Sequence, residues 1–109
     1  MPEQRQHPRH HVTWRVAIFI RNSNAAIHGK TQEISLAGAG ILQPLNLAAD
    51  TPCRLIFEIP SPDFTQRNYL ELEATVIYIS LVGSVSEYRT GFKFKQTDPR
   101  LKAFLDKIH

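Results

Sequence analysis

The chain has 109 residues, a formal net charge of +3 and a single cysteine, Cys53. This length favours one domain, and the lone cysteine excludes an internal disulfide and any zinc site built from several cysteines. Hydrophobic residues make up 42% of the chain, enough to form a core. No apolar run approaches the roughly 20 residues of a membrane helix. The N-terminus lacks an apolar signal segment, so we expect a cytoplasmic protein without membrane insertion.

Basic residues are concentrated at the start of the chain. The basic side chains of residues 1–15 are Arg5, Arg9, Arg15, His7, His10 and His11, against the single acid Glu3. We expect residues 1–12 to form a flexible basic arm that attracts phosphate. The alternative is a charged terminus that only keeps the protein in solution. The histidines have no carboxylate or cysteine at a suitable spacing, so we expect no metal site.

Alternation of apolar and polar residues dominates the body of the chain and predicts strands. The predicted strands are 14–20, 26–33, 39–43, 54–59, 69–79 and 88–95. Pro44 and Pro60 end two of them, because proline cannot donate to a strand ladder. Consecutive antiparallel strands with one buried face predict a sandwich or a small barrel over residues 13–96.

The spacing of apolar residues changes at the end of the chain and predicts a helix over 98–108. Asp98 is a good N-cap, and Pro99 suits the first helical position. The apolar residues Leu101, Phe104, Leu105 and Ile108 then recur at helical spacing. We expect this helix to lay its apolar side across an opening of the barrel or against a partner.

The arm contains two arginines four residues apart, Arg5 and Arg9. Each guanidinium is a planar fork of donors that can grip two phosphate oxygens. In an extended segment, residues four apart project to the same side, and Pro8 favours extended geometry before it. The pair can therefore converge on a ligand that carries two phosphates.

A second motif, Glu33-Ile34-Ser35-Leu36-Ala37-Gly38, follows a predicted strand. The carboxylate of Glu33 can accept from the N1–H and N2–H donors of a guanine, and the Ser35 hydroxyl can serve a phosphate or a base. Gly38 permits positive φ and close approach of a ligand to the backbone. The alternative is a tight turn in which Ser35 bonds locally and the glycine supplies the backbone angles.

Together these motifs resemble the PilZ domain family, bacterial receptors for cyclic di-GMP. Arg5 and Arg9 match the family's arginine pair, and Ser35 and Gly38 match its (Asp/Asn)-x-Ser-x-x-Gly motif. The segment 91–94 resembles the glycine-containing last strand. The resemblance implies a mainly β fold, a six-stranded antiparallel barrel with a C-terminal helix. It also implies that the arginine arm folds over cyclic di-GMP on the outer surface of the barrel, with Arg5, Arg9, Glu33, Ser35 and Gly38 as the ligand-binding residues.

Two positions depart from the family pattern. Glu33 stands where the family has Asp or Asn, so the acceptor is kept but carries one more methylene group. Gln4 stands where many relatives have a further arginine, which makes it a peripheral residue of the predicted site. Tyr78 is a second peripheral residue, because an aromatic side chain near this place lies against guanine in some relatives. Its alternative role is packing at the barrel rim.

The sequence leaves two functions open. The first is a cyclic di-GMP receptor that signals to a protein partner by ordering its arm. The second is a PilZ-like adaptor that has lost the ligand, which the change at Glu33 would explain. A small barrel that binds single-stranded nucleic acid is disfavoured, because Phe92 and Phe94 alternate as core residues and not as exposed platforms. No catalytic motif is present, so we expect neither an enzyme nor a cofactor.

Overall fold

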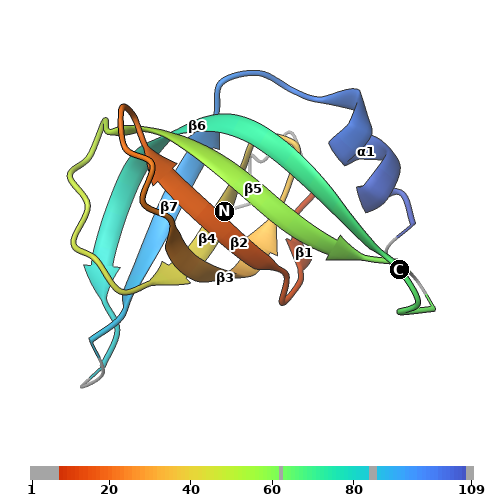
Figure 1. The fold of residues 1–109 in the computed structure, drawn as a ribbon, viewed down its shortest axis with the longest axis horizontal. Coiled ribbons are helices and arrows are strands. Elements are labelled where there is room, and N and C mark those ends of the chain that lie inside the picture. Colours follow the sequence, from red (N-terminus) through yellow and green to blue (C-terminus); the bar gives the residue numbers. More distant parts are fainter. Residues whose placement is uncertain (1–7, 62, 84–85, 108–109) are drawn as a thin grey trace, which may run out of the picture.

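The computed structural model describes residues 8–61, 63–83 and 86–107, which form seven strands and one helix (Figure 1). The elements are β1 (His10–His11), β2 (Arg15–Ile20), β3 (Ile27–Ile34), β4 (Gly38–Gln43), β5 (Pro52–Pro60), β6 (Arg67–Leu81), β7 (Tyr88–Phe94) and α1 (Pro99–Leu105). All six predicted strands and the predicted helix are therefore present. Within these ranges, no helix is long and apolar enough to cross a membrane.

The strands form a closed antiparallel barrel. The sheet runs in the order β1-β3-β2-β5-β6-β7-β4, and pairing between β3 and β4 closes it. The six strands β2 to β7 make the wall, and β1 is added to β3 beyond the end of β2. The predicted six-stranded barrel is confirmed, and the sandwich alternative is excluded.

The short strand β1 lies within the segment that the sequence assigned to the arm. His10 pairs with Ile34 and His11 with Glu33, and the Val12 amide donates to the Gln32 carbonyl at 3.2 Å. The end of the arm is therefore attached to β3, directly beside the second motif. Residues 1–7, which carry the rest of the arm, lie outside the described residues.

The barrel interior follows the predicted alternation. On β6, Leu70, Leu72, Ala74 and Val76 are all buried, as expected for one inward face. The ring of Phe57 lies at the centre of an aromatic cluster, edge-on to Trp14 at 6.5 Å and to Phe94 at 6.1 Å. Such edge-to-face contacts stabilise a core beyond the area they bury.

The helix α1 lies against one end of the barrel (Figure 1). The Asp98 carboxylate accepts from the Arg100 amide at 2.8 Å, and Pro99 follows it, so the predicted start is confirmed. Leu101 and Leu105 are buried in the core, which confirms that the apolar side closes the barrel. The helix ends at Leu105, three residues before the predicted end, and a tighter turn follows in which Lys107 donates to the Phe104 carbonyl.

Candidate functional site

Four residues on neighbouring strands form one row across the outside of the barrel. Glu33 on β3 pairs with Gly40 on β4, Gly40 pairs with Gly91 on β7, and Gly91 pairs with Tyr78 on β6. Glycine inside a strand often marks a place where a ligand or another chain segment approaches the backbone. The two adjacent glycines form a low floor, over which the side chains of Glu33 and Tyr78 lie.

Two irregularities in the sheet turn Glu33 and Tyr78 outward. The register shifts between Thr31 and Glu33 on β3, and again between Val76 and Tyr78 on β6. Strict alternation would place each of these pairs on the same inner face, but the extra residue of a bulge reverses the pattern. Thr31 and Val76, which precede the shifts, are buried, whereas Tyr78, which follows the second one, is 45% exposed.

Arg9 from the arm contacts Glu33. The Arg9 Nη1 donates to the Glu33 Oε1 at 3.0 Å, across 24 residues of sequence. Both side chains are partly exposed, so the pair contributes little to stability. Strand β1 holds the backbone of the arm next to β3, and the contact with Glu33 then places the Arg9 guanidinium beside the second motif.

Ser35 and Gly38 form the turn between β3 and β4. The Ser35 Oγ accepts from the Ala37 amide at 3.1 Å, and the Ser35 amide donates to the Gly38 carbonyl at 2.9 Å. Ser35 thus bonds locally within a turn, as one part of the turn interpretation expects. The prediction that Gly38 uses a positive φ is wrong, since Gly83 is the only glycine with positive φ among the residues that the structure describes. Glycine is needed at residue 38 because a Cβ would collide with the Phe92 carbonyl on β7.

The structure brings most of the predicted residues around one hollow of about 270 Å³, which we call the trough. Its lining includes the predicted residues Arg9, Glu33, Ser35, Gly38 and Tyr78. Arg5 and Gln4 lie outside the described residues, so their place relative to the trough stays a prediction.

Among the lining residues that were not singled out as binding residues from sequence, three bear on what the trough can bind. Gly40 and Gly91 make the floor, and Lys93 adds a cationic side chain at its border. The two glycines could have been noticed in the sequence, because a glycine inside a predicted strand often marks a close approach to the backbone. Lys93 carries no such signal, because exposed lysines are common on strands that face solvent.

The chemistry of the trough suits a flat anionic ligand. The glycine floor lets the Tyr78 ring and the Glu33 side chain lie close to the backbone, and Tyr78 offers an aromatic face to a planar ring. Arg9 and Lys93 supply positive charge, while Glu33 supplies an acceptor. In the part of the chain that the structure describes, no three His, Cys, Asp or Glu side chains are grouped to hold a metal ion.

Comparison with known proteins gives one family over nearly the whole chain. A family model described as PilZ domain matches residues 3–108, a range that includes both motifs. Comparison with curated protein sequences gave no match.

Solved structures share the fold at low sequence identity. The chain resembles the Bacillus subtilis inhibitor of motility MotI/DgrA with a TM-score of 0.77 and 20% identity, covering 96% of this chain and 49% of that one. It resembles the PilZ domain with c-di-GMP of YcgR from Escherichia coli with a TM-score of 0.72 and 17% identity, covering 97% and 88%. For the MrkH–c-di-GMP complex of K. pneumonia the values are 0.71 and 13%, covering 98% and 50%. The chain thus spans about half the length of two of these proteins.

Proposed function

The chain belongs to the PilZ domain family, as its two motifs predicted, and on this basis we propose that it is a receptor for cyclic di-GMP. The observation that carries the proposal is the trough, with its floor of Gly40 and Gly91 between the Arg9–Glu33 pair and Tyr78. Two structures of the same fold, those of YcgR and MrkH, are described as containing c-di-GMP.

In this proposal the arginines hold the phosphates. Arg9 already lies at the end of the trough, and Arg5 would join it when the arm closes over the ligand. A guanidinium can grip two phosphate oxygens and can also stack on a base. Tyr78 would lie against a guanine, and the turn of Ser35 and Gly38 would border it.

Glu33 would bind guanine without releasing Arg9. Only its Oε1 contacts Arg9, and its Oε2 makes no hydrogen bond with any other residue that the structure describes. An ionised carboxylate has about four acceptor sites on its two oxygens. In this proposal Oε2 accepts from an N–H donor of guanine, and the longer side chain of glutamate would let one carboxylate make both contacts.

The signal would pass through the arm. Strand β1 fixes one end of the arm to β3, so a ligand held by Arg9 and Arg5 would order the residues before it. The ligand can shift this equilibrium only by binding the ordered arm more tightly than the free one. A protein partner would then recognise the ordered surface. The chain would act as a cytoplasmic receptor or adaptor, with cyclic di-GMP as its signal and not as a cofactor.

Isothermal titration calorimetry of the full chain with cyclic di-GMP tests the proposal. We expect saturable heat with a defined stoichiometry. A folded sample that gives no heat at high micromolar ligand would reject the ligand assignment. Amide chemical shifts recorded in the same titration would show whether Gly40 and Gly91 are at the binding site and whether the arm changes.

The Arg9–Glu33 pair also favours a second function, an adaptor that works without the ligand. In that case the cation and the carboxylate satisfy each other, and the barrel surface binds a motility or secretion component directly. Glu33→Asp separates the two functions, because it shortens the acceptor to the length the family uses. Binding by Glu33→Asp but not by the wild type would support the adaptor, whereas binding by the wild type would support the receptor.

A further inference from the structure

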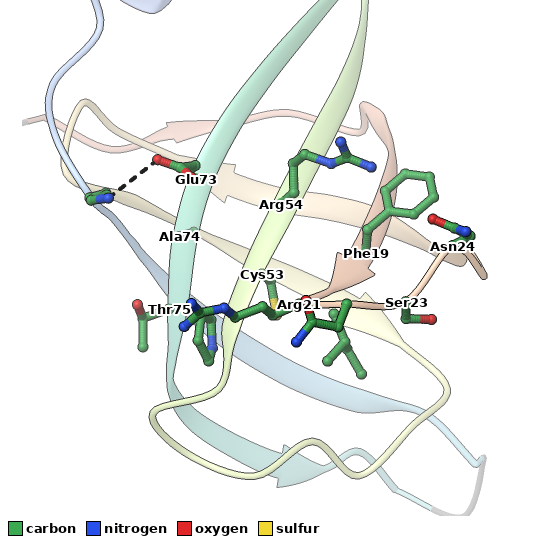
Figure 2. A pocket seen from close by; sticks show the side chains of 13 residues that line it. Phe19, Arg21, Ser23, Asn24, Cys53, Arg54, Glu73, Ala74 and Thr75 are labelled. Atoms are coloured by element: carbon green, nitrogen blue, oxygen red, sulfur yellow. Dashed lines mark ion pairs between the residues drawn. The ribbon is translucent and has the colours of Figure 1, made fainter.

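A second and larger hollow, of about 720 Å³, lies on another wall of the barrel (Figure 2). It is formed by the end of β2, the turn 21–24, the start of β5 and the middle of β6. It shares no lining residue with the trough. In the closed strand order, β5 lies opposite β4, so the two hollows are on different sides of the molecule.

The lining of this hollow is predominantly cationic. It contains Arg21, Arg54 and Lys95 against one carboxylate, Glu73. Lys95 Nζ lies 3.6 Å from Glu73 Oε2, and Arg54 Nη1 lies 4.0 Å from Glu71 Oε2. All four side chains of these two pairs are about half exposed or more, and exposed pairs of this kind contribute roughly 0–1 kcal/mol. An anionic partner that binds these cations more strongly can therefore displace Glu71 and Glu73.

Arg54 and Arg21 have few contacts within the chain that would compete with such a partner. The Arg54 guanidinium carbon lies 4.9 Å from the centroid of the Phe19 ring, a stacking contact that restricts the side chain, and its only ion pair among the described residues is the exposed one with Glu71. The Arg21 side chain makes no hydrogen bond or ion pair with another residue in the described part of the chain. Its backbone is fixed, since the Arg21 amide donates to the Pro52 carbonyl at 3.2 Å.

The rest of the hollow is preformed and partly apolar. Cys53 and Ala74 are buried at its base, next to the partly buried Ile20. The turn at one side is held by the Ser23 amide, which donates to the Ile20 carbonyl at 2.9 Å. Apolar surface below a cationic border fits a chain that carries both carboxylates and aliphatic groups.

We propose that this hollow binds an acidic peptide segment of a protein partner. Figure 2 shows Arg54 and Arg21 over different stretches of β5, so they do not converge on one point as they would around a single phosphate. Carboxylates spaced along an extended peptide match this separation, and each arginine can hold one of them through two hydrogen bonds. The barrel is closed at this wall, so the peptide is recognised by side chains and not by strand addition.

The test uses the full chain labelled with ¹⁵N and two decapeptides, one of alternating glutamate and leucine and one of alternating lysine and leucine. At an ionic strength of about 50 mM, where exposed charges are weakly screened, the glutamate peptide should shift the amides of Arg21, Arg54 and Thr75. The lysine peptide should not. The experiment contains no nucleotide, so its result is independent of the cyclic di-GMP proposal.

Charge reversal gives the matched comparison. Arg21→Glu and Arg54→Glu should each weaken binding of the glutamate peptide by at least about tenfold, because each replaces a contacting cation by a repelling charge. Arg15→Glu makes the same change of net charge on β2, outside the hollow, and should change the affinity less than about threefold. Thermal melting of all three variants verifies that they fold.

Four results would overturn the proposal. The first is the absence of amide shifts at about 1 mM glutamate peptide, a concentration at which even weak peptide complexes form. The second is equal weakening of peptide binding by Arg15→Glu. The third is amide shifts confined to Gly40 and Gly91, and the fourth is the same shifts produced by sodium phosphate at matched ionic strength. The second would show general attraction by the basic surface. The third would place the peptide in the trough, and the fourth would assign the hollow to a small anion.

Discussion

The ring of Tyr78 lies over Gly91, in the space that a Cβ at residue 91 would occupy. Gly91 is paired with both Tyr78 and Gly40, so the ring covers one half of the glycine floor and leaves the other half to Glu33. The Glu33 Cγ lies 3.3 Å from the position of a Cβ on Gly40. Each glycine therefore leaves the space that the neighbouring side chain occupies, Tyr78 over Gly91 and Glu33 over Gly40.

Gly91→Ala should destabilise the protein, because the Tyr78 ring occupies the place of the added methyl group. We expect the free energy of unfolding to fall by about 1–3 kcal/mol, the usual cost of overpacking, because the methyl group must displace the Tyr78 ring. Without that collision, alanine in a strand would be favoured over glycine by roughly 0.5–1 kcal/mol. Urea denaturation measures the change. In a Tyr78→Ala background the loss should disappear, and an equal loss in both backgrounds would contradict the arrangement.

Arg9→Ala tests the role of the arm in ligand binding. We expect affinity for cyclic di-GMP to fall by about 1.5–3 kcal/mol, the contribution of a charged hydrogen-bonding group. Stability should change by less than about 1 kcal/mol, because the pair with Glu33 is partly exposed. Arg15→Ala, an exposed arginine on β2, is the control and should leave the affinity unchanged. An unchanged affinity for Arg9→Ala would remove this arginine from the site.

The strands could be predicted from sequence because burial of one face imposes a period of two. Leu70 to Val76 show this directly, with alternate residues buried along β6. The start of the helix could also be predicted, because the N-cap Asp98 and the first helical residue Pro99 depend only on neighbouring residues. Alternation alone is compatible with a sandwich as well as a barrel, because both bury one face of each strand. The resemblance of the two motifs to a family was needed to predict the barrel.

The geometry of the trough could not be predicted, because it depends on pairing between distant strands. Continued alternation from Leu70 to Val76 would place Tyr78 inside the barrel, and only the bulge turns it outward. The alignment of Gly40 with Gly91 is likewise a matter of register between β4 and β7. The contact of Arg9 with Glu33 depends on β1, a strand of two residues that is too short to show a pattern.

Asp98→Ala should destabilise the closure of the barrel by α1. The Asp98 carboxylate caps the Arg100 amide, and the hydrogen bonds from the Arg100 side chain lower the pKa of this carboxyl. Loss of an N-cap costs about 0.5–2 kcal/mol, and we expect a value in this range by urea denaturation. Asp98→Asn should cost less because asparagine also caps helices. Asp106→Ala, which removes only an exposed pair with Lys102, is the control and should cost a few tenths of a kcal/mol, about the effect of an i,i+4 pair. Equal costs for Asp98→Ala and Asp106→Ala would contradict the capping role.

Asp63 should make the loop between β5 and β6 sensitive to acid. Hydrogen bonds from Ser61 and then from Thr65 lower the pKa of Asp63 from 3.8 to about 2. Phe64, which lies between Asp63 and Thr65, has a φ of 60° and is 81% exposed. Because the pKa is lower in the folded chain, the ionised carboxylate stabilises the loop above pH 3.8, and this stabilisation is lost as the pH falls through about 2.

The Thr65 amide reports this titration, because it donates to the Asp63 Oδ1 at 3.1 Å. We expect its chemical shift to change with a midpoint at about 2 in an NMR series from pH 5 downward. Asp63→Asn should remove the transition, since asparagine keeps one acceptor oxygen but does not titrate in this range. A midpoint at 3.8, the ordinary value, would mean that the three hydrogen bonds do not hold the loop in solution.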